Sequence, residues 1–247
     1  MRRDKRKSGL VRHCRRTRTR DSSLERKRAQ MVAADGSVHR DFSPSVVRKS
    51  VEFSLRNLQR ERLELLHLHA PSTEHVTEEL LRCLEDLQRA GLVCACGING
   101  FGNELQEHVL ANPILSTMMF DFNLLSVERK EYIERLVVAG KGVFASTPLA
   151  QAYFSNKLFK PMRLADLWYL ARALRKHPDK LLRGFKFRFV NDYPGWSGAE
   201  VALAYVLANP GVSAAVFGTT NTRRLLENLR VSGRKLPKDI MQRIEST

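Results

Sequence analysis

The chain has 247 residues, of which 43% are hydrophobic, and it carries a net charge of +16 at neutral pH. That length can bury one sizeable core, and no apolar run approaches the roughly 18 residues that a membrane-spanning helix needs. The N-terminus lacks the apolar stretch of a signal peptide, and the four cysteines do not have zinc-ligand spacing. We therefore expect a cytoplasmic protein with free thiols and no metal site.

The positive charge is concentrated at the start of the chain. Residues 1–40 contain fourteen lysines and arginines against four acidic residues, a net of +10. A folded basic face would mix its charges with apolar positions, whereas this block has almost no apolar periodicity. We interpret residues 1–40 as a basic, disordered segment and place the folded domain at residues 41–247.

From residue 41 onward, helical patterns alternate with short apolar runs. Ser43 followed by Pro44 is typical of a helix start, with an N-cap and proline at the first helical position. Strands are predicted at 63–69, 93–98, 116–123, 142–149 and 214–218. Helices are predicted at 44–58, 77–90, 103–111, 128–139, 163–176, 197–208, 222–231 and 236–245. This alternation indicates an α/β fold built from βα units around a parallel sheet.

The number of units falls short of a closed barrel. A TIM-type (β/α)8 barrel needs eight strands and typically about 250 residues, whereas five strands are predicted here. We therefore expect a barrel that is incomplete at the N-terminus by two to three units. The long stretch at 150–195 follows a strand end, which is where such barrels place active-site loops.

Several motifs resemble those of the aldo-keto reductase family, and their order and spacing extend over residues 35–247. They are Asp41–Pro44, Leu65–Pro71, Gly97–Phe101, Phe122–Leu125, Thr147–Ala150, and Asn209–Val212 leading through Gly218–Asn221 to Leu226–Leu229. The resemblance implies a TIM-barrel oxidoreductase that uses NADP(H). Such an enzyme transfers a hydride between NADPH and an aldehyde or ketone, or acts in reverse on an alcohol or sugar.

The junction after the last strand is the strongest candidate for a cofactor site. A helix N-terminus offers free N–H groups and a positive dipole end to a phosphate, and a glycine permits close backbone approach. By the resemblance, Thr220 and Arg224 hold the adenosine 2′-phosphate, which favours NADP(H) over NAD(H), while Glu227 and Asn228 bind the adenine side. The cofactor residues expected here are Gly218, Thr219, Thr220, Arg224, Glu227 and Asn228. An ordinary helix cap with solvated charges is the alternative.

The family resemblance also implies roles for two further groups of residues. The residues that would hold the pyrophosphate and nicotinamide ribose are Ser146, Thr147, Pro148, Leu149 and Gln151, although a plain strand end also explains them. His69 matches the histidine that orients the substrate carbonyl, and Asn99 matches a nicotinamide contact. His67 shares the face of His69 by strand alternation and is interpreted as structural.

The chain also departs from the family pattern. Gly100 stands where the family has a second nicotinamide-binding side chain, and Met119 replaces a glutamine whose amide it cannot imitate. The family's proton-donating tyrosine, with its lysine and aspartate, belongs upstream of Asp41. None of the five tyrosines precedes Tyr132, so the activity of the chain is left open.

Three alternatives accompany the reductase hypothesis. A catalytically impaired member would at most bind NADP(H). The basic block at residues 1–40 could also be misread sequence rather than an evolved tail. The third alternative, binding of nucleic acid or an acidic partner through this block, is disfavoured because residues 1–40 contain no aromatic residue for base stacking.

Overall fold

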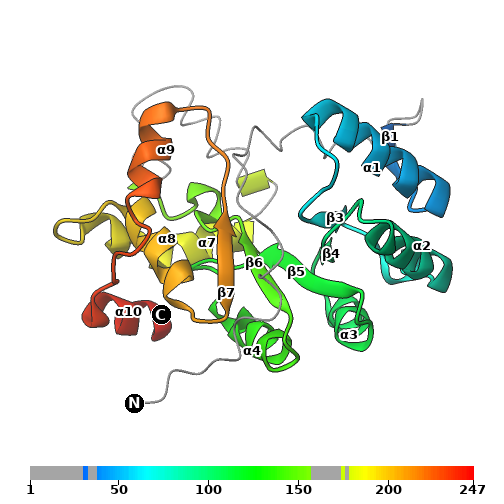
Figure 1. Cartoon of the computed structure of the whole chain (residues 1–247). Coiled ribbons are helices and arrows are strands. Elements are labelled where there is room, and N and C mark those ends of the chain that lie inside the picture. Colours follow the sequence, from blue (N-terminus) through cyan, green and yellow to red (C-terminus); the bar gives the residue numbers. More distant parts are fainter. Residues whose placement is uncertain (1–29, 33–37, 157–173, 176–177) are drawn as a thin grey trace, which may run out of the picture. The chain divides into compact units, whose positions relative to one another are not determined.

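A computed structural model describes residues 30–32, 38–156, 174–175 and 178–247 (Figure 1). The chain divides into two compact units, residues 1–117 and residues 118–247, and strand β5 crosses the boundary. The first unit contains β1 Gln30–Val32, β2 Val38–Arg40, α1 Pro44–Leu58, β3 Leu66–His69, η3 Thr73–His75, α2 Glu78–Arg89, β4 Cys96–Asn99, α3 Asn103–Ala111 and the start of β5 Leu115–Asp121. The second contains η4 Val127–Arg129, α4 Lys130–Val138, β6 Gly142–Ser146, η5 Ala150–Ala152, α7 Pro178–Lys186, η6 Arg188–Asp192, α8 Gly198–Ala208, β7 Val212–Val216, α9 Thr222–Leu229 and α10 Lys238–Glu245.

Five strands form one sheet in the order β3-β4-β5-β6-β7, which is also their order along the chain. Strands β3 and β4 pair in parallel, with His69 opposite Asn99, and β6 and β7 pair in parallel, with Ser146 opposite Val216. The α/β fold and its five strands are thereby confirmed. The strand predicted at 142–149 ends at Ser146 because Thr147 has φ +48°, outside the β region.

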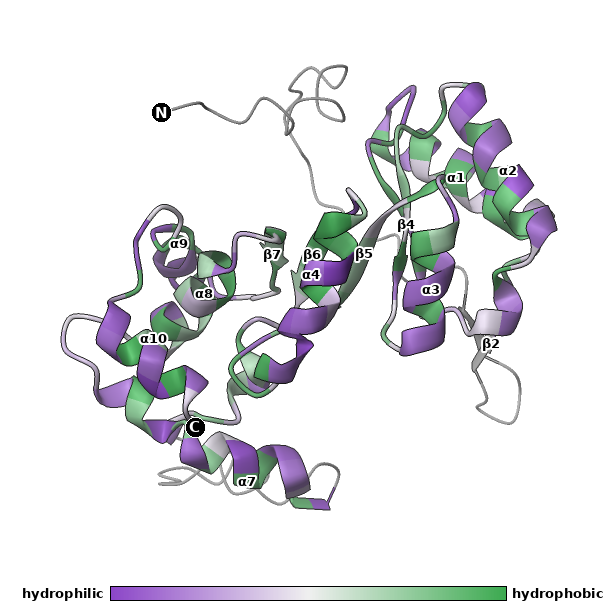
Figure 2. Cartoon of the chain, turned by 90° about the horizontal axis from the view of Figure 1, so that it is seen from below, coloured by the Kyte–Doolittle hydropathy of each residue, from purple (hydrophilic) through white to green (hydrophobic). Residues whose placement is uncertain are grey.

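Helices α1 and α2 carry much of the apolar core of the first unit. Thr77 caps α2 by accepting the backbone N–H of Leu80 at 3.2 Å, and Leu80, Leu84 and Leu87 are buried along one side of this helix. Figure 2 shows both apolar and polar residues on α2, as expected of a helix with one buried face. Ser43 lies at the N-cap of α1, but its hydroxyl makes no capping bond.

The second unit is organised around α8, which is buried over most of its length. Ser197 and Glu200 form a capping box, in which each side chain accepts the backbone N–H of the other residue at 3.3 and 2.7 Å. Phe122, at the end of β5, is fully buried and its ring faces that of Tyr205 on α8 at 6.1 Å. These contacts fix the end of β5, from which several candidate site residues extend.

The structure contains elements that the sequence pattern did not indicate. The hairpin of β1 and β2 lies inside the segment interpreted as disordered, and its three-residue strands are too short to produce a periodic signal. The helix predicted at 163–176 falls almost wholly outside the described residues. The same insertion supplies α7 and η6, neither of which was predicted.

Strand β7 differs from the buried parallel strand that was expected. None of its five residues is buried, although its composition is apolar. It is the last strand in the sheet order, and an edge strand has a neighbour on one side only.

Among the helices that the structure describes, none combines the length and the apolar character that crossing a membrane requires.

Candidate functional site

His69 and Asn99 form a hydrogen-bonded pair at the carboxyl ends of β3 and β4. The side-chain amide of Asn99 lies 2.9 Å from Nδ1 of His69, and the two residues are register partners in the parallel ladder. An amide nitrogen can only donate, so Nδ1 is the acceptor and a neutral ring carries its proton on Nε2. The pair therefore fixes the orientation of the ring at the carboxyl ends of the two strands, with the proton of the neutral ring on Nε2.

His67 is held by a different contact. Its Nε2 lies 2.9 Å from the hydroxyl of Thr117, and burial lowers its pKa to about 4, which keeps the ring neutral near pH 7. Gly97 lies between these two residues. A Cβ on Gly97 would lie 2.1 Å from the Thr117 hydroxyl and 2.8 Å from the His67 ring. His67 thus has structural partners, whereas His69 lies at the strand end.

The loop after β6 is fixed by hydrogen bonds to the end of β5. The Ser146 hydroxyl donates to the carboxylate of Asp121 at 2.7 Å. The side-chain amide of Asn123 donates to the Thr147 carbonyl at 3.1 Å, and its oxygen accepts the backbone N–H of Leu125 at 2.9 Å. Both ends of the Asn123 amide are therefore occupied, the nitrogen by the loop after β6 and the oxygen by the turn that follows β5.

The same loop holds an unusual backbone conformation. Thr147, Ala150, Gln151 and Ala152 have φ values between +47° and +61°, a region that residues other than glycine seldom adopt. A β-branched residue such as Thr147 is especially strained there. Such strain persists only where the surrounding structure enforces it, and it is concentrated at functional sites. Within the loop, Pro148 is buried, Leu149 is half-buried and Gln151 is exposed.

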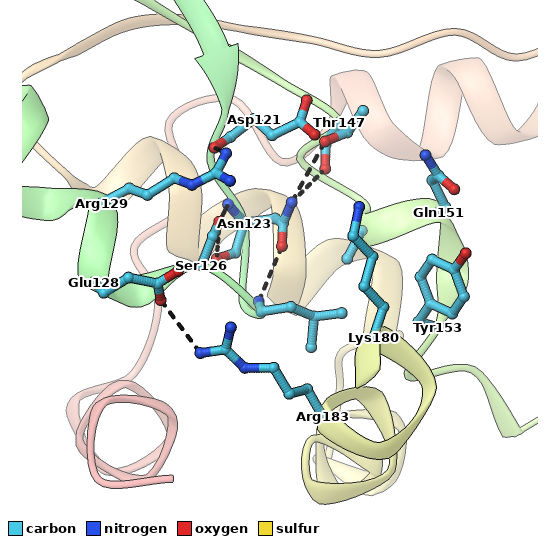
Figure 3. A pocket seen from close by; sticks show the side chains of 12 residues that line it. Asp121, Asn123, Ser126, Glu128, Arg129, Thr147, Gln151, Tyr153, Lys180 and Arg183 are labelled. Carbon is cyan, nitrogen blue, oxygen red and sulfur yellow. Dashed lines mark hydrogen bonds and ion pairs between the residues drawn. The ribbon is translucent and has the colours of Figure 1, made fainter. Parts of the chain in front are cut away.

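A cavity of about 100 Å³ opens beside this loop, entirely within the second unit (Figure 3). Its polar and charged walls come from the end of β5, the loop after β6 and helix α7. The lining residues are Asp121, Asn123, Leu125, Ser126, Glu128, Arg129, Thr147, Ala150, Gln151, Tyr153, Lys180 and Arg183. Two of the residues proposed from sequence, Thr147 and Gln151, line this cavity.

The junction between β7 and α9 has an open, solvated geometry. Asn221 is the N-cap of α9 and accepts the backbone N–H of Arg224 at 3.1 Å, while the Thr219 hydroxyl accepts the N–H of Asn221 at 3.1 Å. Thr220 and the Arg224 side chain are exposed, and neither side chain has a partner among the residues that the structure describes. A Cβ on Gly218 would touch nothing within 4 Å.

Two residues assigned to the adenine side are engaged differently. Glu227 accepts a hydrogen bond from Arg223 one turn earlier at 2.9 Å, whereas Asn228 is buried, with 6% exposure. A ligand that used Glu227 would compete with the guanidinium of Arg223. Asn228 lies on the packed side of α9, away from its exposed face.

The residues proposed from sequence thus fall into three groups, at the carboxyl ends of strands or just after them. His69 and Asn99 end β3 and β4, Ser146 ends β6 and is followed by 147–151, and 218–228 follow β7. Sequence reasoning missed Asp121 and Lys180 as cavity residues. Asp121 lies near the end of the strand predicted at 116–123, which is a usable signal, whereas Lys180 belongs to a helix that was not predicted.

The family of the chain follows from comparisons with known proteins. The sequence model of the aldo/keto reductase family matches residues 17–247. The chain is 24% identical over 208 residues to the uncharacterized oxidoreductase YqkF of Bacillus subtilis, covering 83% of this chain and 67% of YqkF. It is 26% identical over 200 residues to L-galactose dehydrogenase of Arabidopsis thaliana, covering 76% of this chain and 58% of that protein.

Solved structures show the same fold. The holo form of aldo-keto reductase AKR11C1 from Bacillus halodurans superposes with a TM-score of 0.68 at 19% identity, covering 83% of this chain and 68% of that chain. The glycerol dehydrogenase AKR11B4 from Gluconobacter oxydans gives 0.69 at 23% identity, with 85% and 65% covered. The chain thus spans about two thirds of the length of these proteins. With a family match over most of its residues, the chain belongs to the aldo/keto reductase family.

Proposed function

We propose that this chain is an NADP(H)-dependent oxidoreductase that acts on small aldehydes or ketones, or in reverse on an alcohol or sugar. The observation that carries the proposal is the His69–Asn99 hydrogen bond at paired strand ends. Bound NADPH would supply the hydride. The residues of the chain would orient the carbonyl and hold the dinucleotide.

The role of His69 follows from its tautomer. With Nδ1 accepting from Asn99, the neutral ring carries its proton on Nε2, and this N–H would donate to the carbonyl oxygen of a bound substrate. A donor fixed before the reaction stabilises the negative charge that develops on this oxygen, without the cost of reorienting the ring. His69 would therefore position and polarise the substrate carbonyl.

The residues after β7 fit a phosphorylated dinucleotide in their chemistry. Arg224 offers a planar, permanently charged guanidinium that has no partner within the described part of the chain, and Thr220 adds an exposed hydroxyl. Both lie in or next to the first turn of α9, where the helix dipole favours an anion. These features support binding of the 2′-phosphate and hence a preference for NADPH.

A second candidate function is binding of NADP(H) without turnover. Two departures favour it, the glycine at Gly100 and the thioether of Met119 in place of amide-bearing side chains. The sequence also contains no tyrosine before Tyr132 that could serve as the family's proton donor. Nicotinamide positioning and proton transfer would both be weakened, while the adenosine contacts of α9 would be unaffected.

Titration of the full chain with NADPH and with NADH, followed by calorimetry, tests the first step. Tighter binding of NADPH supports the proposal, and binding of neither dinucleotide rejects both candidates. Carbonyl reduction is then measured by the loss of NADPH absorbance with a panel of aldehydes and ketones. Turnover supports the reductase, whereas tight binding without turnover supports the second candidate.

A further inference from the structure

The cavity beside Thr147 carries more positive than negative charge. Three of its lining residues are cationic and two are carboxylates. Arg183 pairs with Glu128 at 3.3 Å, and the carboxylate of Asp121 accepts the Ser146 hydroxyl at 2.7 Å. The ammonium of Lys180 has no hydrogen bond or ion pair with any described residue. Arg129 donates to the backbone carbonyl of Asp121 at 2.6 Å. Lys180 is therefore the lining cation that has no partner among the described residues.

The cavity that contains this charge is also lined by an uncommitted amide. Figure 3 shows Lys180 extending from α7 toward the loop that carries Thr147 and Gln151. The amide of Asn123 is already used at both ends, by Thr147 and Leu125. The exposed Gln151, held in a strained backbone conformation with φ +51°, supplies the remaining uncommitted amide of the lining.

The volume of the cavity limits what it can hold. Pockets for whole small-molecule ligands and cofactors measure about 300–1,000 Å³, and a water molecule occupies about 30 Å³ of liquid. A space of about 100 Å³ is too small for a dinucleotide. It suits one group of a few heavy atoms, such as a carboxylate or a phosphate.

We propose that Lys180 and Gln151 form a subsite for the anionic end of a small substrate, a carboxylate or a phosphate. This gives Gln151 a role other than the cofactor contact expected from the family resemblance. The assignment to the substrate rests on the proposed reductase function; the anion site itself does not. Helix α7 belongs to the long insertion after β6, and such loops set substrate choice in folds of this kind. Lys180 is then a residue that determines specificity.

Calorimetric titration of the full chain with inorganic phosphate and with acetate, at low and constant ionic strength, tests the subsite. We expect Lys180→Met to weaken binding of the preferred anion about fivefold, because a single exposed charge contributes modestly. Lys186→Met is the matched control, since Lys186 is exposed on the same helix but outside the cavity. It changes the net charge equally and should leave the affinity unchanged.

The outcomes separate the subsite from the proposed function. Absence of anion binding by the wild type, or equal weakening by Lys180→Met and Lys186→Met, overturns the subsite.

Repeating the titration with saturating NADPH shows whether the anion belongs to the substrate or to the cofactor. Displacement by NADPH would make this a cofactor contact and overturn the substrate assignment, whereas unchanged affinity supports it. Failure of NADPH to bind rejects the proposed function, while the phosphate and acetate titrations still test the subsite.

Discussion

The two units hold their candidate functional groups in opposite ways. In the first, His69 is bonded to Asn99 across paired strands, and its neighbour His67 is held by Thr117. In the second, Thr220 and Arg224 are exposed and have no side-chain partner among the described residues. A donor that must meet one atom at a fixed point benefits from a rigid support. A cation that must receive an incoming phosphate is better left solvated, because a protein partner would first have to be displaced.

The largest difference should appear at two glycines, one in each unit. Gly97→Ala places a methyl group 2.4 Å from the backbone carbonyl of Thr117, so the packed strands must separate. We expect a loss of about 3 kcal/mol in the free energy of unfolding, as for overpacking in a tight core. Gly218→Ala meets nothing within 4 Å and should change stability by less than about 0.5 kcal/mol. Urea denaturation of both variants measures the difference.

The second glycine also tests the cofactor site. If the backbone at Gly218 approaches a bound dinucleotide closely, Gly218→Ala should weaken NADPH binding while leaving the unfolding curve unchanged. Equal stability of the Gly97 and Gly218 variants would contradict the contrast between a packed and an open region. Unchanged NADPH affinity in Gly218→Ala would remove the close-approach role of this glycine.

Acid should weaken the first unit through His67. Its pKa is about 4 in the folded protein and about 6.5 when unfolded, so the unfolded chain binds the proton first as the pH falls. Stability from this group is complete above about pH 6.5 and is lost progressively down to about pH 4. The expected loss is about 3 kcal/mol, measured as the unfolding free energy across this window.

His67→Gln provides the control for this titration. The variant loses the contact with Thr117 and has a lower baseline stability, but it has no ring to protonate at this position. Its unfolding free energy should therefore fall less steeply than that of the wild type between pH 6.5 and pH 4. Parallel curves for the two proteins would show that His67 does not carry the pH dependence.

A smaller and more selective effect is expected at α9. Arg224→Leu should weaken NADPH binding about tenfold, the usual effect of losing a hydrogen bond to a charged group, and leave NADH binding unchanged. Arg230→Leu removes the same charge at the other end of this helix and should have little effect on either dinucleotide. Calorimetry on both variants distinguishes them. Similar losses from the two substitutions would assign the effect to net charge alone.

Most of the fold could be predicted because local signals and packing agree. Pro44 and the apolar spacing after it gave the bounds of α1 without error, and the helix at 103–111 was equally well defined. The β1–β2 hairpin and α7 were missed because three-residue strands and a helix inside an irregular insertion carry weak periodic signals. Strand β7 looked like a buried strand by composition, but burial depends on neighbours that composition does not specify.

The site was less predictable than the fold. Family motifs indicated His69 and Asn99 as separate candidates, yet only coordinates show that Asn99 selects the tautomer of the ring. The strained conformation of Thr147 and the engagement of Asn123 depend on contacts between segments more than twenty residues apart. The charge pattern of the sequence could not distinguish Lys180, which lines the cavity, from Lys186, which does not.

The subtlest expected change concerns the proton on His69. Asn99→Asp replaces the amide donor with a carboxylate, which can only accept, so Nδ1 must carry a proton to keep the contact. We expect stability to change by less than about 1.5 kcal/mol, because one hydrogen bond replaces another. Long-range proton–nitrogen correlation spectra should report Nε2–H in the wild type and a protonated Nδ1 in the variant. An Nδ1–H tautomer already present in the wild type would contradict the role proposed for Asn99, because the ring would then offer a carbonyl oxygen no donor at Nε2.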